Sequence, residues 1–221
     1  MFTTIMYGTG VFWTLTYLLI IRRGHLDHTY GMPLVALCVN ISWEFLFSFL
    51  YPQSVIQQII NVIWFALDVV ILIQLLRYGP REFADLSKQA FYAIVGLALA
   101  TCFCAVLFFT IEFHDRGTYS AFGSNLLMSV LFIEMLYHRR SLRGQSISIA
   151  VCKLLGTALA SLAFYLYFPL GHQPLFVMLF LYVSIFVCDV IYVGMLYVQQ
   201  RAMTQKPMMA SNQREMSMES G

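Results

Sequence analysis

Four ionisable side chains lie deep inside long apolar runs of the sequence, and they are the residues best suited to chemistry. They are Glu44, Asp68, Lys153 and Asp189. A charged side chain at the centre of a bilayer costs about 2.5 to 3.5 kcal/mol on insertion scales, so such residues face a protein interior and are candidates for function. The alternative is that they only pair with one another and hold a helix bundle together.

The chemistry that buried carboxyl groups offer is proton donation. A low-dielectric surrounding penalises the ionised form of a carboxyl group, which then keeps its proton at neutral pH. Such an acid is suited to attack on an unreactive epoxide or alkene. Aromatic faces nearby can stabilise the resulting carbocation, as they stabilise other cations.

Polar and aromatic side chains lie one helical turn from each of the three acids. Asn40 lies one turn before Glu44, Trp64 one turn before Asp68, and Tyr192 one turn after Asp189. Besides the acids Glu44 and Asp189, the candidates for a substrate pocket are Asn40, Trp43, Trp64, Asp68, Asn125, Lys153 and Tyr192. A polar and aromatic stripe of the first apolar run is also expected to face inward, and it consists of Tyr7, Gly10, Thr14 and Tyr17.

The elements that must position these residues are transmembrane helices. The chain has 221 residues, 60% of them hydrophobic and 11% charged, which is typical of an integral membrane protein. Runs of about 20 apolar residues are long enough to cross a hydrocarbon core as helices, and they lack the alternation of a membrane β-barrel. We expect an all-α bundle of seven helices over residues 4–21, 32–51, 55–76, 90–111, 119–137, 147–168 and 175–198.

Two parts of the chain are expected. Residues 1–198 form a single seven-helix membrane domain, and the polar segment 199–221 forms a disordered cytoplasmic tail. The first apolar run is longer than a signal-peptide core and is expected to be a true span.

The basic residues predict the orientation. Seven spans put the two termini on opposite sides, and loops rich in Lys and Arg stay in the cytoplasm. One side carries Arg22, Arg23, Arg77, Arg81, Lys88, Arg139, Arg140, Arg143, Arg201, Lys206 and Arg214, whereas the other has only Arg116. We therefore predict an N-terminus outside or in a lumen and a cytoplasmic C-terminus. Glu134 is expected to pair with Arg139 and Arg140 at the membrane interface.

The depths of the acids suggest the shape of the pocket. With a rise of about 1.5 Å per residue, Glu44 lies about 10 Å below the outer end of its helix, and Asp68 and Asp189 lie about 20 Å below theirs. The acids are therefore expected to be spread along an elongated pocket walled by Tyr, Phe and Trp. Such a pocket suits a long apolar ligand.

Several kinds of site are absent from the sequence. There is no Asp-Asp pair of the kind that binds magnesium diphosphate, and no G-x-x-x-x-G-K, H-E-x-x-H or G-x-S-x-G motif. The net charge of +2 comes with no basic patch for nucleic acid. His25, Asp27 and His28 lack metal-ligand spacing. We therefore predict no cofactor, no metal and no nucleic-acid partner.

Three stretches resemble a known family. The chain reads D-H-T-Y-G-M from Asp27, L-C-V-N-I-S-W-E from Leu37 and Y-P at Tyr51. This resembles the small integral-membrane terpene cyclases of fungal meroterpenoid and indole-diterpene biosynthesis, of the pyripyropene and paxilline type. Lys153 with the following Gly-Thr pair, and the D-x-x-Y that begins at Asp189, are similar to two further motifs of that family. The resemblance covers nearly the whole chain except the tail.

The resemblance implies an isomerase or lyase of secondary metabolism that protonates the terminal epoxide, or an alkene, of a lipophilic prenylated substrate. Its required Glu and Asp correspond to Glu44 and Asp189, one as proton donor and the other as the residue that orients or restores the donor; which is which stays open. The implied functional partners are an upstream prenyltransferase and epoxidase, and the implied setting is membrane lipid, of the endoplasmic reticulum if the host is fungal. Asp68 and the lysine at 153 depart from the family pattern.

A transporter is the competing interpretation. Pro52-Gln53 and seven helices are also features of PQ-loop and SWEET-like carriers, which contain two three-helix repeats. A second Pro-Gln pair is expected in such a repeat, but the later pair is reversed, as Gln173-Pro174. This disfavours the transporter.

Overall fold

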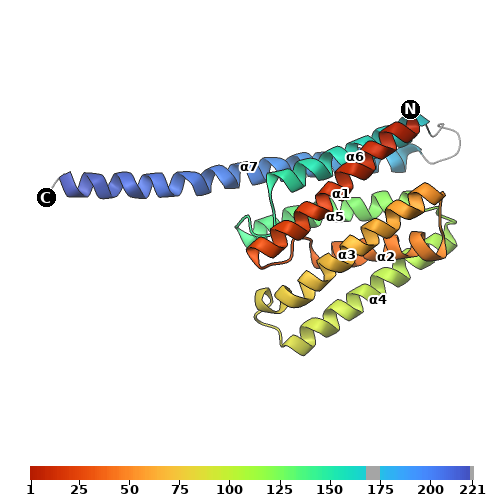
Figure 1. The fold of residues 1–221 in the computed structure, drawn as a ribbon, viewed down its shortest axis with the longest axis horizontal. Coiled ribbons are helices and arrows are strands. Elements are labelled where there is room, and N and C mark those ends of the chain that lie inside the picture. Colours follow the sequence, from red (N-terminus) through yellow and green to blue (C-terminus); the bar gives the residue numbers. More distant parts are fainter. Residues whose placement is uncertain (168–174, 220–221) are drawn as a thin grey trace.

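The protein is an all-helical membrane protein. A computed structural model describes residues 1–167 and 175–219, with the side chains of 175 and 205–219 left undescribed, and it has no strand in these ranges (Figure 1). Six helices there are long and apolar enough to cross a membrane: α1 (Phe2–Asp27), α3 (Val55–Glu82), α4 (Lys88–Glu112), α5 (Thr118–Arg139), α6 (Ile147–Tyr167) and α7 (Leu175–Glu219). A shorter apolar helix, Leu34–Leu50, completes the seven. The predicted all-α class is confirmed.

The short helix is the centre of the bundle. It consists of α2 (Leu34–Phe45) and the π-helical turn η1 (Leu46–Leu50), and α2 packs against α3, α4 and α5. On the other side of the bundle, α1 packs along α6, and α7 packs against α5 and α6 (Figure 1). Because α1 also contacts α3, the two groups of helices enclose an interior space.

Helix α2 is shorter than predicted. It begins after Pro33, whose fixed φ suits the position before a helix, and from Leu46 its backbone widens into a π turn. Gln58 Nε2 donates a hydrogen bond of 2.8 Å to the Ser48 carbonyl oxygen in this turn. The extra residue of a π turn shifts everything after it around the axis. Tyr51, seven residues after Glu44 and so on the same face of a regular α-helix, is 43% exposed.

Helix α3 is longer than predicted, because it continues through Gly79 and Pro80 to Glu82. Proline cannot donate to the carbonyl one turn earlier, which here belongs to Leu76; Tyr92 Oη of α4 donates to that oxygen at 3.5 Å. Gly79 lies against the buried ring of Phe91, where a Cβ atom would overlap the ring. Contacts with α4 therefore keep this last turn helical.

The extension of α3 determines an ionic cluster at one end of the bundle. Glu82 accepts a hydrogen bond of 2.9 Å from Arg139 and also one from Thr29. Arg139 lies 4.2 Å from the ring centre of Tyr30. The predicted pairing of Glu134 with Arg139 and Arg140 is wrong, because Glu82 takes Arg139 and Glu134 pairs with His138 at 3.3 Å.

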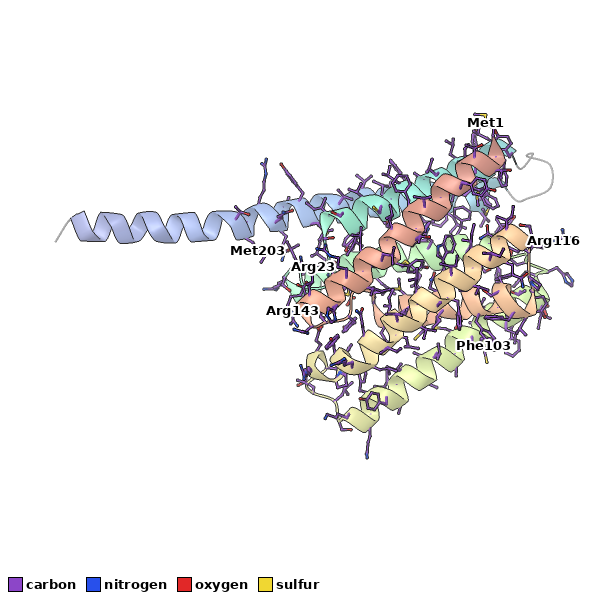
Figure 2. All side chains as sticks on the ribbon, in the orientation of Figure 1. Met1, Arg23, Phe103, Arg116, Arg143 and Met203 are labelled. Atoms are coloured by element: carbon purple, nitrogen blue, oxygen red, sulfur yellow. The ribbon has the colours of Figure 1, made fainter. Side chains whose placement is uncertain are left out.

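The two ends of the bundle differ in charge. Arg23 and Arg143 lie at the end where α7 leaves the bundle toward Met203, and Met1 and Arg116 lie at the opposite end (Figure 2). Helix α7 continues past the other helices (Figure 1), so the segment predicted as a tail begins within it. The disorder predicted for 199–221 stays a prediction, and residues 220 and 221 lie outside the described residues, as does the Gln-Pro pair at 173 and 174.

Candidate active site

A cavity of about 150 Å³ lies between α1, α2, α3, α5 and α6. All three tryptophans of the chain line it, together with Tyr17, Phe122 and Phe164. Its polar lining includes Thr9, Asn40, Glu44, Gln53, Gln57, Thr118, Ser124 and Asn125. An apolar cavity with a few convergent polar groups is the usual form of a small-molecule site.

Glu44 is the acid of this cavity. It is 1% exposed, and its Oε1 accepts hydrogen bonds from Tyr17 Oη at 2.6 Å and from Asn40 Nδ2 at 2.9 Å. Its Oε2 has no donor among the described residues. One oxygen is therefore held by the protein, and the other is available to carry a proton.

Asp68 lies next to Glu44 and is fully buried, but it does not line the cavity. Asn40 Nδ2 donates to Asp68 Oδ2 at 2.7 Å as well as to Glu44. The prediction that Glu44 and Asp68 are separated by their different depths is wrong. Asn40 lies one turn deeper than Glu44 and bridges the difference in level between the two helices.

Asp189 has a different kind of partner. Lys153 Nζ donates to Asp189 Oδ1 at 2.7 Å and to Ser129 Oγ at 2.6 Å, and both charged side chains are almost completely buried. The same ammonium lies 5.8 Å from the ring centre of Trp13, which is one of the residues lining the cavity. The ion pair is therefore one layer behind the cavity wall.

The sequence candidates thus separate into two groups. Asn40, Trp43, Glu44, Trp64 and Asn125 line the cavity, whereas the other four do not. Asp189 instead borders a second hollow of about 340 Å³ between α6 and α7. Tyr192, one turn from Asp189, donates at 2.8 Å to Gln145 in the connection before α6 and packs on Phe132.

Hydrogen bonds hold the aromatic walls in place. Trp64 Nε1 donates to Thr14 Oγ1 at 3.0 Å, and Trp43 Nε1 donates to Ser120 Oγ at 3.0 Å. Ser120 Oγ in turn donates at 2.6 Å to Asp115, which also accepts from the first backbone N–H groups of α5. Because the indole N–H groups of Trp43 and Trp64 are satisfied, these two rings keep fixed positions in the cavity wall.

Two connections between helices line one end of the cavity through Gln53 and Gly117, and we call this end its mouth. Gln53 Nε2 donates to the Arg116 carbonyl oxygen at 2.7 Å. Gly117 has a φ of +90°, and a Cβ there would come within 2.6 Å of Gln53 Nε2 and 3.1 Å of Trp43. Only glycine fits both the backbone conformation and the space.

Sequence reasoning missed the hydrogen-bonding roles of two polar residues at the site. Tyr17 was expected to face inward, and it does, but its bond to Glu44 was not foreseen. Tyr7 of the same stripe is 52% exposed, so that part of the stripe was wrong. Ser129, one turn after Asn125, binds Lys153; its helical spacing from Asn125 was the available signal. Among the described residues, no three His, Cys, Asp or Glu side chains gather as a metal site.

Comparisons with known proteins agree with this architecture. The sequence pattern of the Pyr4-like transmembrane terpene cyclases matches residues 1–202. A Pyr4-family terpene cyclase, mfmH, of Annulohypoxylon moriforme is 32% identical over 161 residues, which are 71% of this chain and 66% of that protein. The terpene cyclase macJ of Penicillium terrestre is 29% identical over 164 residues, which are 71% and 64% of the two chains.

A third relative, the terpene cyclase pyr4 of Aspergillus fumigatus, is 27% identical over 174 residues, which are 76% of this chain and 71% of that protein. No solved structure matches the chain. The fold and the site define a multi-pass helical membrane protein with a buried acid in an aromatic cavity. The chain belongs to the Pyr4-like transmembrane terpene cyclases, and the match spans about two thirds of the length of the first two relatives.

Proposed function

We propose that this chain is a membrane-bound terpene cyclase that starts a carbocationic cyclisation by protonating its substrate. The observation that carries the proposal is the position of Glu44. It lies on the wall of an aromatic cavity, and among the described residues it has no cationic partner. A buried carboxyl group without a counter-ion is more stable with its proton than without it.

The reaction balances as an isomerisation. The proton leaves Glu44 and forms an O–H bond with the terminal epoxide oxygen, and the C–O bond breaks with its electron pair on oxygen. Alkene electron pairs then form C–C bonds in succession, and the last cation loses a proton to a base or to water. The rings of Trp13, Trp43 and Trp64 lie where they can stabilise the cations between these steps.

The partners of the two family acids support Glu44 as the donor. Asp189 has a cationic partner, Lys153, at 2.7 Å, whereas Glu44 has none among the described residues. Asp189 and Lys153 instead support the wall behind Trp13. We therefore assign proton donation to Glu44 and an orienting role to Asp189.

The substrate that fits this site is a lipophilic small molecule with a prenyl chain that carries a terminal epoxide or alkene. The apolar lining takes the chain, and Gln53, Gln57 and Asn125 near the mouth offer polar contacts to a head group. Asn125 Oδ1 has no donor among the described residues and is free to accept one from the substrate. A prenyltransferase and an epoxidase must supply such a substrate.

The same proposal includes a setting in the cell. The N-terminus lies outside or in the lumen, the C-terminus lies in the cytoplasm, and the membrane is the endoplasmic reticulum if the host is fungal. Arg23 and Arg143 at one end of the bundle support this orientation. Residues 1–198 act as one membrane domain, and the segment from 199 is a cytoplasmic extension. The transporter alternative has no support, because the relatives named above are terpene cyclases.

Product analysis tests the function. Microsomes that contain the chain are supplied with an aryl compound bearing a terminally epoxidised farnesyl group, or with its geranylgeranyl homologue. The expected result is a product of unchanged mass with a new retention time and fewer double bonds. Recovery of only unreacted substrate from both incubations, with transport of either compound across sealed proteoliposomes, would contradict the proposal.

A further inference from the structure

The carboxyl groups of Glu44 and Asp68 form one unit. Both side chains are buried, Asn40 Nδ2 donates to both of them at 2.9 and 2.7 Å, and the two carboxyl groups lie within hydrogen-bonding reach of each other. A carboxylate can only accept hydrogen bonds. A hydrogen bond between the two groups therefore needs a proton on at least one of them.

The surrounding charges favour protons on the pair. In the described part of the chain no lysine, arginine or histidine forms an ion pair with either acid. Two adjacent carboxylates without a cation repel each other and cannot both be ionised in a low-dielectric interior. Glu44 Oε2 and Asp68 Oδ1 receive no bond from a donor in this region, and these are the oxygens left to carry protons.

We propose that Asp68 is a positioning residue for the acid step. Its carboxyl group donates a hydrogen bond to the Glu44 carboxylate that is left behind when the substrate is protonated. In the resting pair each carboxyl group carries a proton. When Glu44 gives its proton to the substrate, the Asp68 hydroxyl donates to the new carboxylate. The pair then holds one proton instead of two, and one proton from solvent restores the second.

This inference rests on the proposed function. The role of Asp68 follows from its position beside Glu44 and not from the lining of the cavity. Asp68 does not line the cavity, and it meets the cavity wall through Asn40 and Glu44. Tyr17 Oη, which donates to Glu44 Oε1 at 2.6 Å, acts in the same direction, because its bond also strengthens when Glu44 is ionised. Asn40 Nδ2 donates to the same oxygen at 2.9 Å, so three groups stabilise the conjugate base of one acid.

Infrared spectroscopy tests the pair without any substrate. The chain is placed in lipid nanodiscs at neutral pH, and the carbonyl stretch of protonated carboxyl groups is compared between wild type and variants. Asp68→Asn is expected to remove the band of Asp68 and shift the band of Glu44. Glu44→Gln is expected to remove the band of Glu44 and shift the band of Asp68. The matched control Asp189→Asn removes no protonated band, because that carboxylate is in an ion pair.

Two outcomes would overturn the inference. One is a wild-type spectrum in which Asp68→Asn removes no protonated band, and the other is a Glu44 band that keeps its position when Asp68 is replaced. If Asp68→Asn does not fold, Glu44→Gln makes the same comparison through the band of Asp68. Coupled bands in a chain that cyclises nothing would contradict the proposed function and leave the pair intact.

Turnover separates a positioning role from a structural one. Asp68→Leu is expected to lower kcat roughly 10- to 100-fold, the worth of a hydrogen bond to a charged group, with KM changed by about twofold or less. Asp68→Asn keeps an N–H donor and is expected to lose less. Equal losses in the two variants, or a loss that appears mainly in KM, would contradict the assigned role.

Discussion

Glu44 and Asp189 are carboxyl groups buried in one bundle, but their neighbours give them different chemistry. Glu44 accepts from a phenol and an amide, whereas Asp189 accepts from an ammonium group at 2.7 Å. A neutral acid can donate a proton, whereas an ion-paired carboxylate can fix the positions of its neighbours, here Lys153 and the wall behind Trp13. The division of labour therefore follows from the identity of each partner.

Removing the cation from the buried ion pair should destabilise the protein strongly. Lys153→Met leaves Asp189 without a counter-ion, and loss of one partner of a buried pair costs about 3 to 5 kcal/mol. The double variant Lys153→Met with Asp189→Leu is expected to recover most of this free energy of unfolding, which is measured by denaturant titration in micelles. The control Glu134→Gln, in an exposed pair with His138, should cost about 0.5 kcal/mol or less.

A double variant no more stable than Lys153→Met would contradict the view that the unpaired charge causes the loss of stability.

Sequence reasoning was most useful for single residues, because the cost of membrane insertion singled out Glu44, Asp68, Lys153 and Asp189 by residue type alone. It could not pair them. Which acid meets which partner depends on helix rotation and on the reach of Asn40, and neither is encoded in the spacing of one helix.

The ends of the helices carry information that their apolar centres do not. Helix α3 continues through Gly79 and Pro80 because α4 supplies a partner for the freed carbonyl and a ring that only glycine can accommodate. This last turn brings Glu82 to Arg139. A sequence signal that normally ends a helix was therefore overruled by packing against a neighbour.

A methyl group at position 79 tests this packing. Gly79→Ala should overpack the contact with the buried Phe91 ring and lower the free energy of unfolding by about 1 to 3 kcal/mol. The control is Gly96→Ala in α4, where nothing lies within 4 Å of the new Cβ. That variant should be neutral or more stable by about 0.4 to 1 kcal/mol, because alanine suits a helix better. Equal stabilities of the two variants would argue against a tight contact at Gly79.

The existence of each helix could be predicted from the sequence, and its details could not. Long apolar runs are unambiguous in a membrane protein, because lipid offers the backbone no other partner. The π turn after Phe45 and the position of Tyr51 gave no such signal. Both depend on side chains of α3, such as Gln58, that reach the turn from another part of the sequence.

In the whole molecule, the charged residues at the ends of the bundle bear on its orientation in the membrane, and the cavity inside it bears on its chemistry. Arg23 and Arg143 lie at one end, and Arg116 lies at the other (Figure 2). The cavity lies inside the bundle, with its mouth at the connection that contains Arg116 and Gly117. If the orientation proposed above holds, this mouth faces the outer or lumenal half of the membrane.

Protease protection tests that orientation. In sealed microsomes, an epitope at the C-terminus should be digested without detergent, because the cytoplasmic side is accessible, and an epitope at the N-terminus should be protected until detergent is added. Digestion of both epitopes, or of the N-terminal one alone, would contradict the proposed topology. The charge count predicted this arrangement, but it has no bearing on which residues meet inside the bundle.

The measurement that tests the central claim most directly is the rate of cyclisation by Glu44→Gln. Glutamine keeps an oxygen that can accept from Tyr17 and Asn40, so the fold and the substrate KM should be preserved while the transferable proton is lost. With the epoxidised farnesyl aryl substrate, kcat should fall by about 100-fold or more, the usual contribution of a general acid. A Glu44→Gln protein that folds and cyclises this substrate at the wild-type rate would show that Glu44 is not the proton donor.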